Sequence, residues 1–248
     1  MRLSLIFCTL LVLSTSYASA GIFDDPKNLK VLPENISPEE LSATMRGFSI
    51  GTGLRCSGCH VGEDDQKLTE YDFESDEKEY KKKARKMLEM VNAINNEHLD
   101  AIAEDHVQVQ CVTCHRGVQE PKLLGQVLAE AAEDNGADGV RETYASLKEE
   151  YYGTHSYDFS EFTLSSFART QGLSGNMPEA MAMLDIMLEE NSESFQAHFL
   201  YGELSFISGD MVLAKEHLLT ALKINPKAVF INRRLKEIEE TFRLKKPV

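Results

Sequence analysis

The chain has 248 residues, of which 40 are acidic and 26 basic, and its formal net charge at pH 7 is −14. Nucleic acids and anionic lipid surfaces repel a protein of this charge. The composition therefore excludes both as partners and favours either simple solubility or a basic protein partner. The length is sufficient for two small domains.

The first twenty residues have the pattern of a secretory signal peptide. Arg2 provides a positive charge, residues 3–13 are apolar, and small residues at positions 18–20 precede a predicted cleavage site before Gly21. The apolar run is shorter than the ~20 residues that cross a bilayer, and Cys8 lacks the preceding small residues of a lipoprotein signal. We therefore expect an exported, periplasmic protein with no integral membrane segment after the signal is removed.

Residues 21–36 contain two prolines and little periodicity, which predicts an extended lead-in. A helix is predicted to begin after Ser37, because a proline follows it and Glu40 can complete a capping box with it. The helix should end at Gly51 and Gly53. Its apolar face is formed by three residues at helical spacing: Leu41, Met45 and Phe48.

Two copies of the pattern C-x-x-C-H stand out, at residues 56–60 and 111–115. The pattern is typical of c-type haem attachment, in which two thiols bond to the vinyl groups of one haem and the adjacent histidine can reach the iron. A four-cysteine zinc site usually has its pairs about 15–20 residues apart, whereas 51 residues lie between Cys59 and Cys111. A redox dithiol needs neither the histidine nor a second copy.

The sequence thus predicts two covalently bound haem c groups, with their irons held first by the motif histidines. The predicted attachment residues are Cys56, Cys59, His60, Cys111, Cys114 and His115. Since Cys8 belongs to the signal peptide, no cysteine remains for a disulfide. Met45 lies on the helix that directly precedes the first motif, so we expect it to be the second axial ligand of haem 1, opposite His60.

A second long helix is predicted from Ser75 to about Asn96, with Ser75 as N-cap and Asp76 and Glu77 in the first turn. Its predicted apolar face consists of Tyr80, Ala84, Met87, Leu88, Val91 and Ile94. The same helix carries a basic cluster of Lys81, Lys82, Lys83, Arg85 and Lys86. We interpret this cluster as a solvated face, with a docking patch or a neutraliser of haem propionates as the alternative.

The spacing of the residues does not identify the second axial ligand of haem 2. Met87 and Met90 lie less than one helical turn apart before the second motif, and either could bind the iron opposite His115. His98 and His106 are the rivals, and would give a bis-histidine site of lower potential.

Several short motifs follow one another between Asn28 and Pro121. They are Asn-Leu-Lys-Val-Leu at 28–32, Met45 with Phe48, the first C-x-x-C-H, Ser75-Asp76, residues 84–87, Met90-Val91, Ile94-Asn95, and the second C-x-x-C-H with Arg116-Gly117. Together they resemble the two-haem half-unit of the photosynthetic reaction-centre cytochrome c subunit family, particularly its small members from non-photosynthetic bacteria.

The resemblance implies that a helical methionine ligates each iron opposite the motif histidine. Met45 fits this role, and Met90 fits it better than Met87 because of its position before Ile94-Asn95. The photosynthetic members have four motifs and this chain has two. The resemblance therefore supports a role of the haems in electron transfer and gives no support for a photosynthetic role.

The C-terminal half resembles a different family. After Pro121 a loop is predicted at 135–139 and a helix at 140–152. From residue 160 onwards, residues of like kind recur 34 positions apart: Phe167 and Tyr201, Ala168 and Gly202, Gly175 and Gly209, Ala180 and Ala214. This period is typical of tetratricopeptide repeats, which bind proteins or peptides and seldom catalyse reactions.

The predicted organisation is a signal peptide at 1–20, a dihaem cytochrome c domain at 21–121, a helical linker at 122–159 and tetratricopeptide-like repeats at 160–248 with a capping helix at 229–243. The fold class is all-α, with a haem-organised helical domain and little regular sheet. His155, His198 and His217 lie outside the haem half, and we expect them to be surface or hydrogen-bonded helical histidines.

We expect a periplasmic carrier of single electrons rather than an enzyme. The repeats would dock a redox partner protein, basic in character, or a second copy of the chain. The alternatives are a peroxidase-like dihaem enzyme with one open iron, and a scaffold or assembly protein that carries haem as structure.

Overall fold

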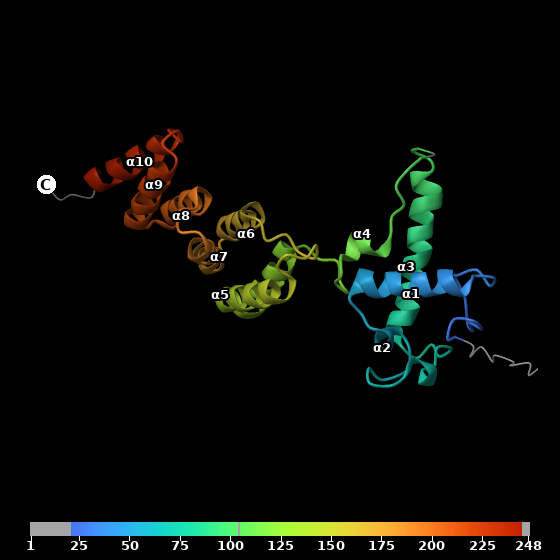
Figure 1. Cartoon of the computed structure of the whole chain (residues 1–248). Helices are drawn as coiled ribbons and strands as arrows, with labels where there is room; N and C mark the ends of the chain where they lie inside the picture. The colour runs from blue at the N-terminus through green and yellow to red at the C-terminus, as the bar shows by residue number, and fades with distance from the viewer. Residues whose placement is uncertain (1–20, 104, 245–248) are drawn as a thin grey trace, which may run out of the picture. The chain divides into compact units, whose positions relative to one another are not determined.

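The computed structural model describes residues 21–103 and 105–244, so the predicted signal peptide and Cys8 lie outside the described residues. The chain divides into two compact units, with the boundary between Cys114 and His115. The predicted all-α class is confirmed, since the regular structure of the described residues is helical (Figure 1). Extended backbone pairs among them at one isolated bridge, between Val61 and Asp72.

The first unit consists of a long lead-in, two helices of fifteen residues and several shorter turns. Its elements are α1 (Pro38–Thr52), α2 (Cys56–Cys59), the 3-10 turn η1 (Leu68–Glu70), α3 (Glu79–Ala93), the wide π-type turn η2 (Ile94–Leu99) and the start of α4 (Cys111–His115). Helices α1 and α3 cross one another (Figure 1). Side chains from both helices line one pocket.

The start of α1 is as predicted. The Ser37 hydroxyl accepts a hydrogen bond from the Glu40 backbone N–H at 3.2 Å, and the Glu40 carboxylate accepts one from the Ser37 backbone N–H at 3.1 Å. These bonds satisfy two donors that a helix start leaves free. Gly53 ends the helix in the left-handed region (φ 73°), whereas Gly51 lies inside it. The prediction that Gly51 helps to end α1 is therefore wrong.

The start of α3 differs from the prediction. Ser75 is not its N-cap, because residues 72–78 form a non-helical strap and the helix begins at Glu79. The Asp72 carboxylate accepts hydrogen bonds from the backbone N–H groups of Glu74 and Ser75, at 3.0 and 2.9 Å. The Asp76 side chain is held by cations from two other segments. It cannot also occupy a first helical turn, and the helix begins three residues later than predicted.

At its other end, α3 continues directly into η2 and so runs to Leu99, beyond the predicted Asn96. Asn95 is buried there, and its side-chain amide bonds the backbone of Val109 in both directions, at 2.9 and 2.8 Å. This pair of bonds closes the loop between η2 and the second C-x-x-C-H motif.

The second unit is a series of helices whose buried apolar residues form two clusters. They are α5 (Leu124–Tyr151), α6 (Glu161–Leu173), α7 (Met177–Glu190), α8 (Phe195–Ser208), α9 (Met211–Ile224) and α10 (Ile231–Leu244). Neighbours in sequence pack against each other along the series (Figure 1). The predicted break at 135–139 is a kink within α5, where only Asn135 and Gly136 leave helical geometry.

The 34-residue spacing appears in the positions of the helices. α6 and α8 begin 34 residues apart, at Glu161 and Phe195, and so do α7 and α9. Gly175 and Gly209 occupy equivalent turns, both in the left-handed region with φ of 92° and 90°. The geometry agrees with the period, while membership in the tetratricopeptide family remains a prediction.

Gly202 is required where α8 meets α9. A Cβ atom at this position would lie 2.6 Å from Leu218 Cγ and 3.1 Å from the Ala214 carbonyl oxygen. Gly202→Val should therefore lower the free energy of unfolding by about 1–3 kcal/mol through overpacking, as measured by thermal unfolding followed by circular dichroism. Gly125→Val is the control, because no atom lies within 4 Å of its Cβ position. Equal losses in both variants would contradict the close packing.

Candidate functional site

The first C-x-x-C-H motif forms one helical turn, α2, followed by an extended residue. The His60 backbone N–H donates to the Cys56 carbonyl at 2.9 Å, and His60 itself has extended geometry. Both thiols are free of disulfides. Two thiols and an imidazole thus project from five consecutive residues, which is the arrangement that covalent haem attachment needs.

These three side chains line the same pocket as Met45. The lead-in, α1, α2, η1, the strap and α3 all contribute to its walls, which are mainly apolar. The apolar residues include Leu32, Leu41, Phe48, Leu54, Leu68 and Leu88. The predicted face of α1 is therefore confirmed, because Leu41, Met45 and Phe48 all contribute to this pocket.

The predicted apolar face of α3 is only partly right. Lys81, Ala84, Arg85 and Leu88 line the pocket, at the i, i+3, i+4, i+7 spacing of one helical face. Tyr80 and Met87, which were assigned to that face, are each 38 % exposed. Two members of the basic cluster therefore line the pocket.

His60 lies in a dry, positively charged setting. Its Nδ1 is buried without a hydrogen-bond partner, and the ring packs edge-on against Phe73 with 4.9 Å between centroids. Burial, followed by the charges of Lys81 and Arg85, lowers the pKa of His60 to about 4, and the Phe73 carbonyl opposes the shift weakly. The imidazole is therefore neutral at pH 7, as a metal ligand must be.

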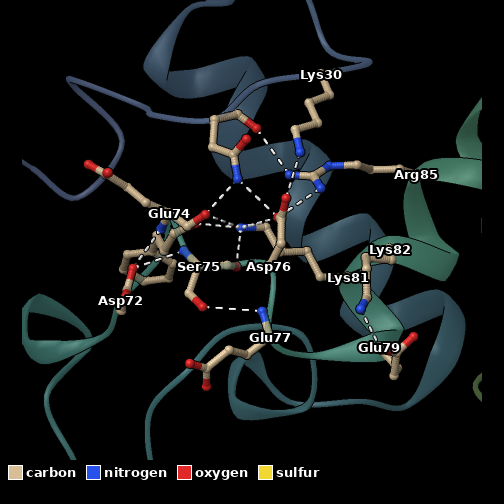
Figure 2. Close-up of polar contacts among 12 residues, drawn as sticks. Lys30, Asp72, Glu74, Ser75, Asp76, Glu77, Glu79, Lys81, Lys82 and Arg85 are labelled. Carbon is tan, nitrogen blue, oxygen red and sulfur yellow. Dashed lines mark hydrogen bonds and ion pairs between the residues drawn. The ribbon is translucent and has the colours of Figure 1, made fainter.

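A network of ion pairs centred on Asp76 borders the pocket (Figure 2). Its carboxylate lies 2.6 Å from Lys30 Nζ, 2.8 Å from Arg85 Nη1 and 3.5 Å from Lys81 Nζ. The Asn28 side-chain amide donates to it at 2.9 Å. The hydrogen bond from Lys30, followed by the bond and charge of Arg85, holds the pKa of Asp76 well below its usual range. The carboxylate thereby joins the lead-in, the strap and α3.

The remaining cations of α3 face solvent. Lys82 pairs with Glu79, and Lys86 pairs with Glu89 at 2.9 Å. The Lys83 ammonium lies 5.3 Å from the centre of the Tyr80 ring. The basic cluster is thus divided between a pocket-facing pair and exposed residues, most of whose charge is balanced locally.

The second motif forms α4, in which Cys111 and Cys114 belong to the first unit and His115 to the second. Helix α1 touches the first of these cysteines: a Cβ atom at Gly51 would lie 2.9 Å from Cys111 Cβ and 3.2 Å from the Val112 nitrogen. In the second unit, His115 Nδ1 lies 3.1 Å from the Val118 carbonyl oxygen. A hydrogen bond there would leave Nε2 free for a metal.

The candidates for the second axial ligand of haem 2 differ in their surroundings. Met87 and Met90 are 38 % and 45 % exposed on α3. His106 Nε2 is 2.8 Å from the Asp100 carboxylate, and this hydrogen bond is the largest cause that raises the pKa of His106. His98 is exposed. Iron binding through Nε2 of His106 would first have to break its bond to Asp100, whereas the two methionines need give up no hydrogen bond.

Comparison with known proteins gives one match. A family model described as photosynthetic reaction centre cytochrome C subunit matches residues 18–165. The chain belongs to this family. The match covers both C-x-x-C-H motifs and extends through α5 to the start of α6, beyond the end of the resemblance expected at Pro121. No curated protein and no solved structure matches the chain.

Membership in this cytochrome family implies covalently bound haem, and the residues of the first pocket fit that group. Leu41 is the only apolar side chain that is buried in the described part of the first unit. Many of the other apolar side chains of that unit line the pocket around two free thiols, a neutral imidazole and a thioether. Such walls suit a large, flat, apolar macrocycle with a metal at its centre.

The histidines outside the first unit take part in local contacts or lie at the surface. His198 Nδ1 is 3.0 Å from His217 Nδ1, and the Tyr201 ring stacks on His217 with 4.0 Å between centroids. His155 is exposed. Separately, none of the helices in the described part of the chain combines the length and the apolar character needed to cross a bilayer.

Sequence reasoning missed Asp76 and Gly51 as parts of the site. Asp76 was assigned to a helix start, and its partners in the lead-in lie more than 40 residues away. Gly51 was interpreted as a helix stop. A signal was available for Lys81 and Arg85, because they share one helical face with Ala84 and Leu88.

Asp76→Asn should weaken the first unit most at neutral pH. A carboxylate whose pKa is lowered on folding contributes stability above its unfolded pKa and loses it as pH falls through the folded value. The difference in melting temperature between the two proteins should therefore be large at pH 7 and shrink in strong acid. Asp25→Asn removes an exposed pair with Lys27 and should have little effect at either pH. A constant difference across pH would contradict the assignment.

Gly51→Val should push α1 away from the second motif. Because its Cβ would overlap that of Cys111, we expect incomplete attachment of the second haem, seen by mass spectrometry as a one-haem species. Gly47→Val, in the same helix, has no atom within 4 Å of its Cβ position and should retain both haems. Full haem content in both variants would show that the contact is dispensable.

Proposed function

We propose that the chain is a periplasmic dihaem c-type cytochrome that carries single electrons. The observation that carries the proposal is that Met45, Cys56, Cys59 and His60, from two separate helical segments, line one apolar pocket. Bound haem supplies an iron that cycles between ferric and ferrous states by gain or loss of one electron.

At the first site, Cys56 and Cys59 would form the thioether links, and His60 and Met45 would be the axial ligands. At the second site, the links would come from Cys111 and Cys114 and the axial ligands would be His115 and Met90, with Met87 as the alternative. The first of these assignments is supported by pocket geometry and the second by motif order and family membership.

The chain's own residues fix the positions of the haem ligands and provide an apolar pocket. The capping box fixes the start of the helix that bears Met45, and α2 fixes the distance between the two thiols and His60. The mainly apolar walls would keep water away from a haem bound in the pocket. With the ligands held this way, little structure has to rearrange when the charge of the site changes by one, which favours fast electron transfer.

The second unit would dock a redox partner or a second copy of the chain. Support comes from its stacked helices with a 34-residue period, an arrangement that usually presents a binding surface. The Gly202→Val variant tests this role, because it perturbs the repeats and leaves the haem sites intact. Partner binding that is unchanged in that variant would count against docking by the repeats.

The first experiment is the optical spectrum of the purified protein in both oxidation states, with a pyridine haemochrome count and a carbon monoxide titration. We expect two haems, both low-spin with methionine ligation and both inert to carbon monoxide. A haem that binds carbon monoxide would have an open iron and would favour a peroxidase-like enzyme instead.

Met45→Leu should remove one of the two methionine-to-iron absorption signals and leave the other intact, because leucine fills similar space but cannot bind iron. Met90→Leu should remove the other signal, and Met87→Leu, on the same helix, should preserve both. Two intact signals in Met45→Leu would contradict the assignment of Met45 as an axial ligand of haem 1. Loss of the second signal in Met87→Leu instead of Met90→Leu would reassign haem 2.

A further inference from the structure

Lys81 is a cation held almost entirely by backbone oxygens. Its side chain is 11 % exposed, and its ammonium donates to the carbonyls of Phe73, Glu74 and Ser75 at 2.7, 3.2 and 2.7 Å (Figure 2). Asp76 lies 3.5 Å away and also serves Lys30 and Arg85. Lys81 therefore brings a positive charge to the pocket that is only partly balanced.

One of these carbonyls belongs to a residue that contacts the candidate iron ligand. Phe73 contacts the His60 ring, and its carbonyl is the acceptor that acts on the pKa of that ring. His60 Nδ1 is buried and lacks a partner at hydrogen-bond distance. The Phe73 carbonyl is thus bonded to the Lys81 ammonium, in a residue whose ring contacts the imidazole with the unpartnered Nδ1.

We propose that Lys81 raises the reduction potential of haem 1 by competing with the Nδ1–H of His60 for the Phe73 carbonyl and by placing its charge beside the pocket. This inference rests on the proposed function, since it requires His60 to bind the iron.

Two effects act in the same direction. A ligating histidine becomes a stronger donor when its other N–H bonds a carbonyl, and a carbonyl already bonded to an ammonium is a weaker acceptor. His60 therefore donates less to the iron, which disfavours the ferric state. The nearby positive charge also disfavours the more positive ferric state. Reduction adds one electron to the iron and neither forms nor breaks a bond to the chain.

The test is a potentiometric titration of both haems in the full-length holoprotein with Lys81→Met. At a fixed ambient potential, the ferrous-to-ferric ratio of haem 1 should fall about tenfold, which is about 59 mV for a one-electron couple. Haem 2 should change much less. Lys86→Met removes the same charge from the same helix at a side chain that is 78 % exposed, and should leave haem 1 nearly unchanged.

A second variant separates charge from hydrogen bonding. Lys81→Gln keeps a donor for the carbonyls but loses the charge, so its potential should fall between those of the wild type and Lys81→Met. The exchange rate of the His60 Nδ1 proton, measured by NMR in the reduced protein, gives an independent readout. It should slow in Lys81→Met, because the freed carbonyl would bond that proton.

The proposal is overturned by an unchanged haem 1 potential in Lys81→Met, by an equal fall in Lys86→Met, or by faster Nδ1 proton exchange. Faster exchange would mean that Lys81 merely holds the strap in place. Failure of the proposed function would look different, because the wild-type protein itself would then lack a low-spin haem ligated by His60.

Discussion

Much of the apolar surface of the first unit lines a pocket instead of a packed core. The second unit buries two apolar clusters, one in α5 to α8 and one in α9 to α10, whereas the first buries a single apolar side chain, Leu41, among its described residues. Burial of apolar surface is the main force that folds proteins. The arrangement of α1, α3 and the lead-in therefore depends on what the pocket contains, and haem supplies the apolar surface that the chain does not.

At the edge of that pocket, ion pairs join the segments instead of apolar contacts. Asp76 binds Lys30 and Arg85 and lies near Lys81, so one carboxylate joins the lead-in, the strap and α3. Three cations thus gather around one carboxylate in a chain whose net charge is −14.

The sequence is most informative where a local pattern has one physical meaning. Ser37 and Glu40 specify the start of α1 because the capping box is a contact over three residues, and the C-x-x-C-H spacing specifies the attachment chemistry. The start of α3 could not be found in the same way. Ser75 and Asp76 have the local pattern of a helix start, but Asp76 is bound by residues 46 and 48 positions earlier, and this long-range network overrides the local preference.

Gly51 is a second case in which a long-range contact could not be predicted from the local sequence. Glycine within a helix usually indicates an end or a weak point, and here it permits a backbone approach that no local pattern encodes. The period of 34 residues, by contrast, predicted the order and spacing of α6 to α9, because each repeat packs mainly on its neighbours. Local and nearest-neighbour interactions could be predicted, and contacts between distant segments could not.

The unequal cores of the two units have a consequence for the life of the protein in the cell. A newly made chain can fold its second unit on apolar cores of its own, while its first unit lacks comparable packing until haem is attached. During a shortage of haem, proteases would degrade the first unit and leave the helical stack from about residue 124 onwards. Haem supply, more than the rate of synthesis, would then determine how much intact protein accumulates.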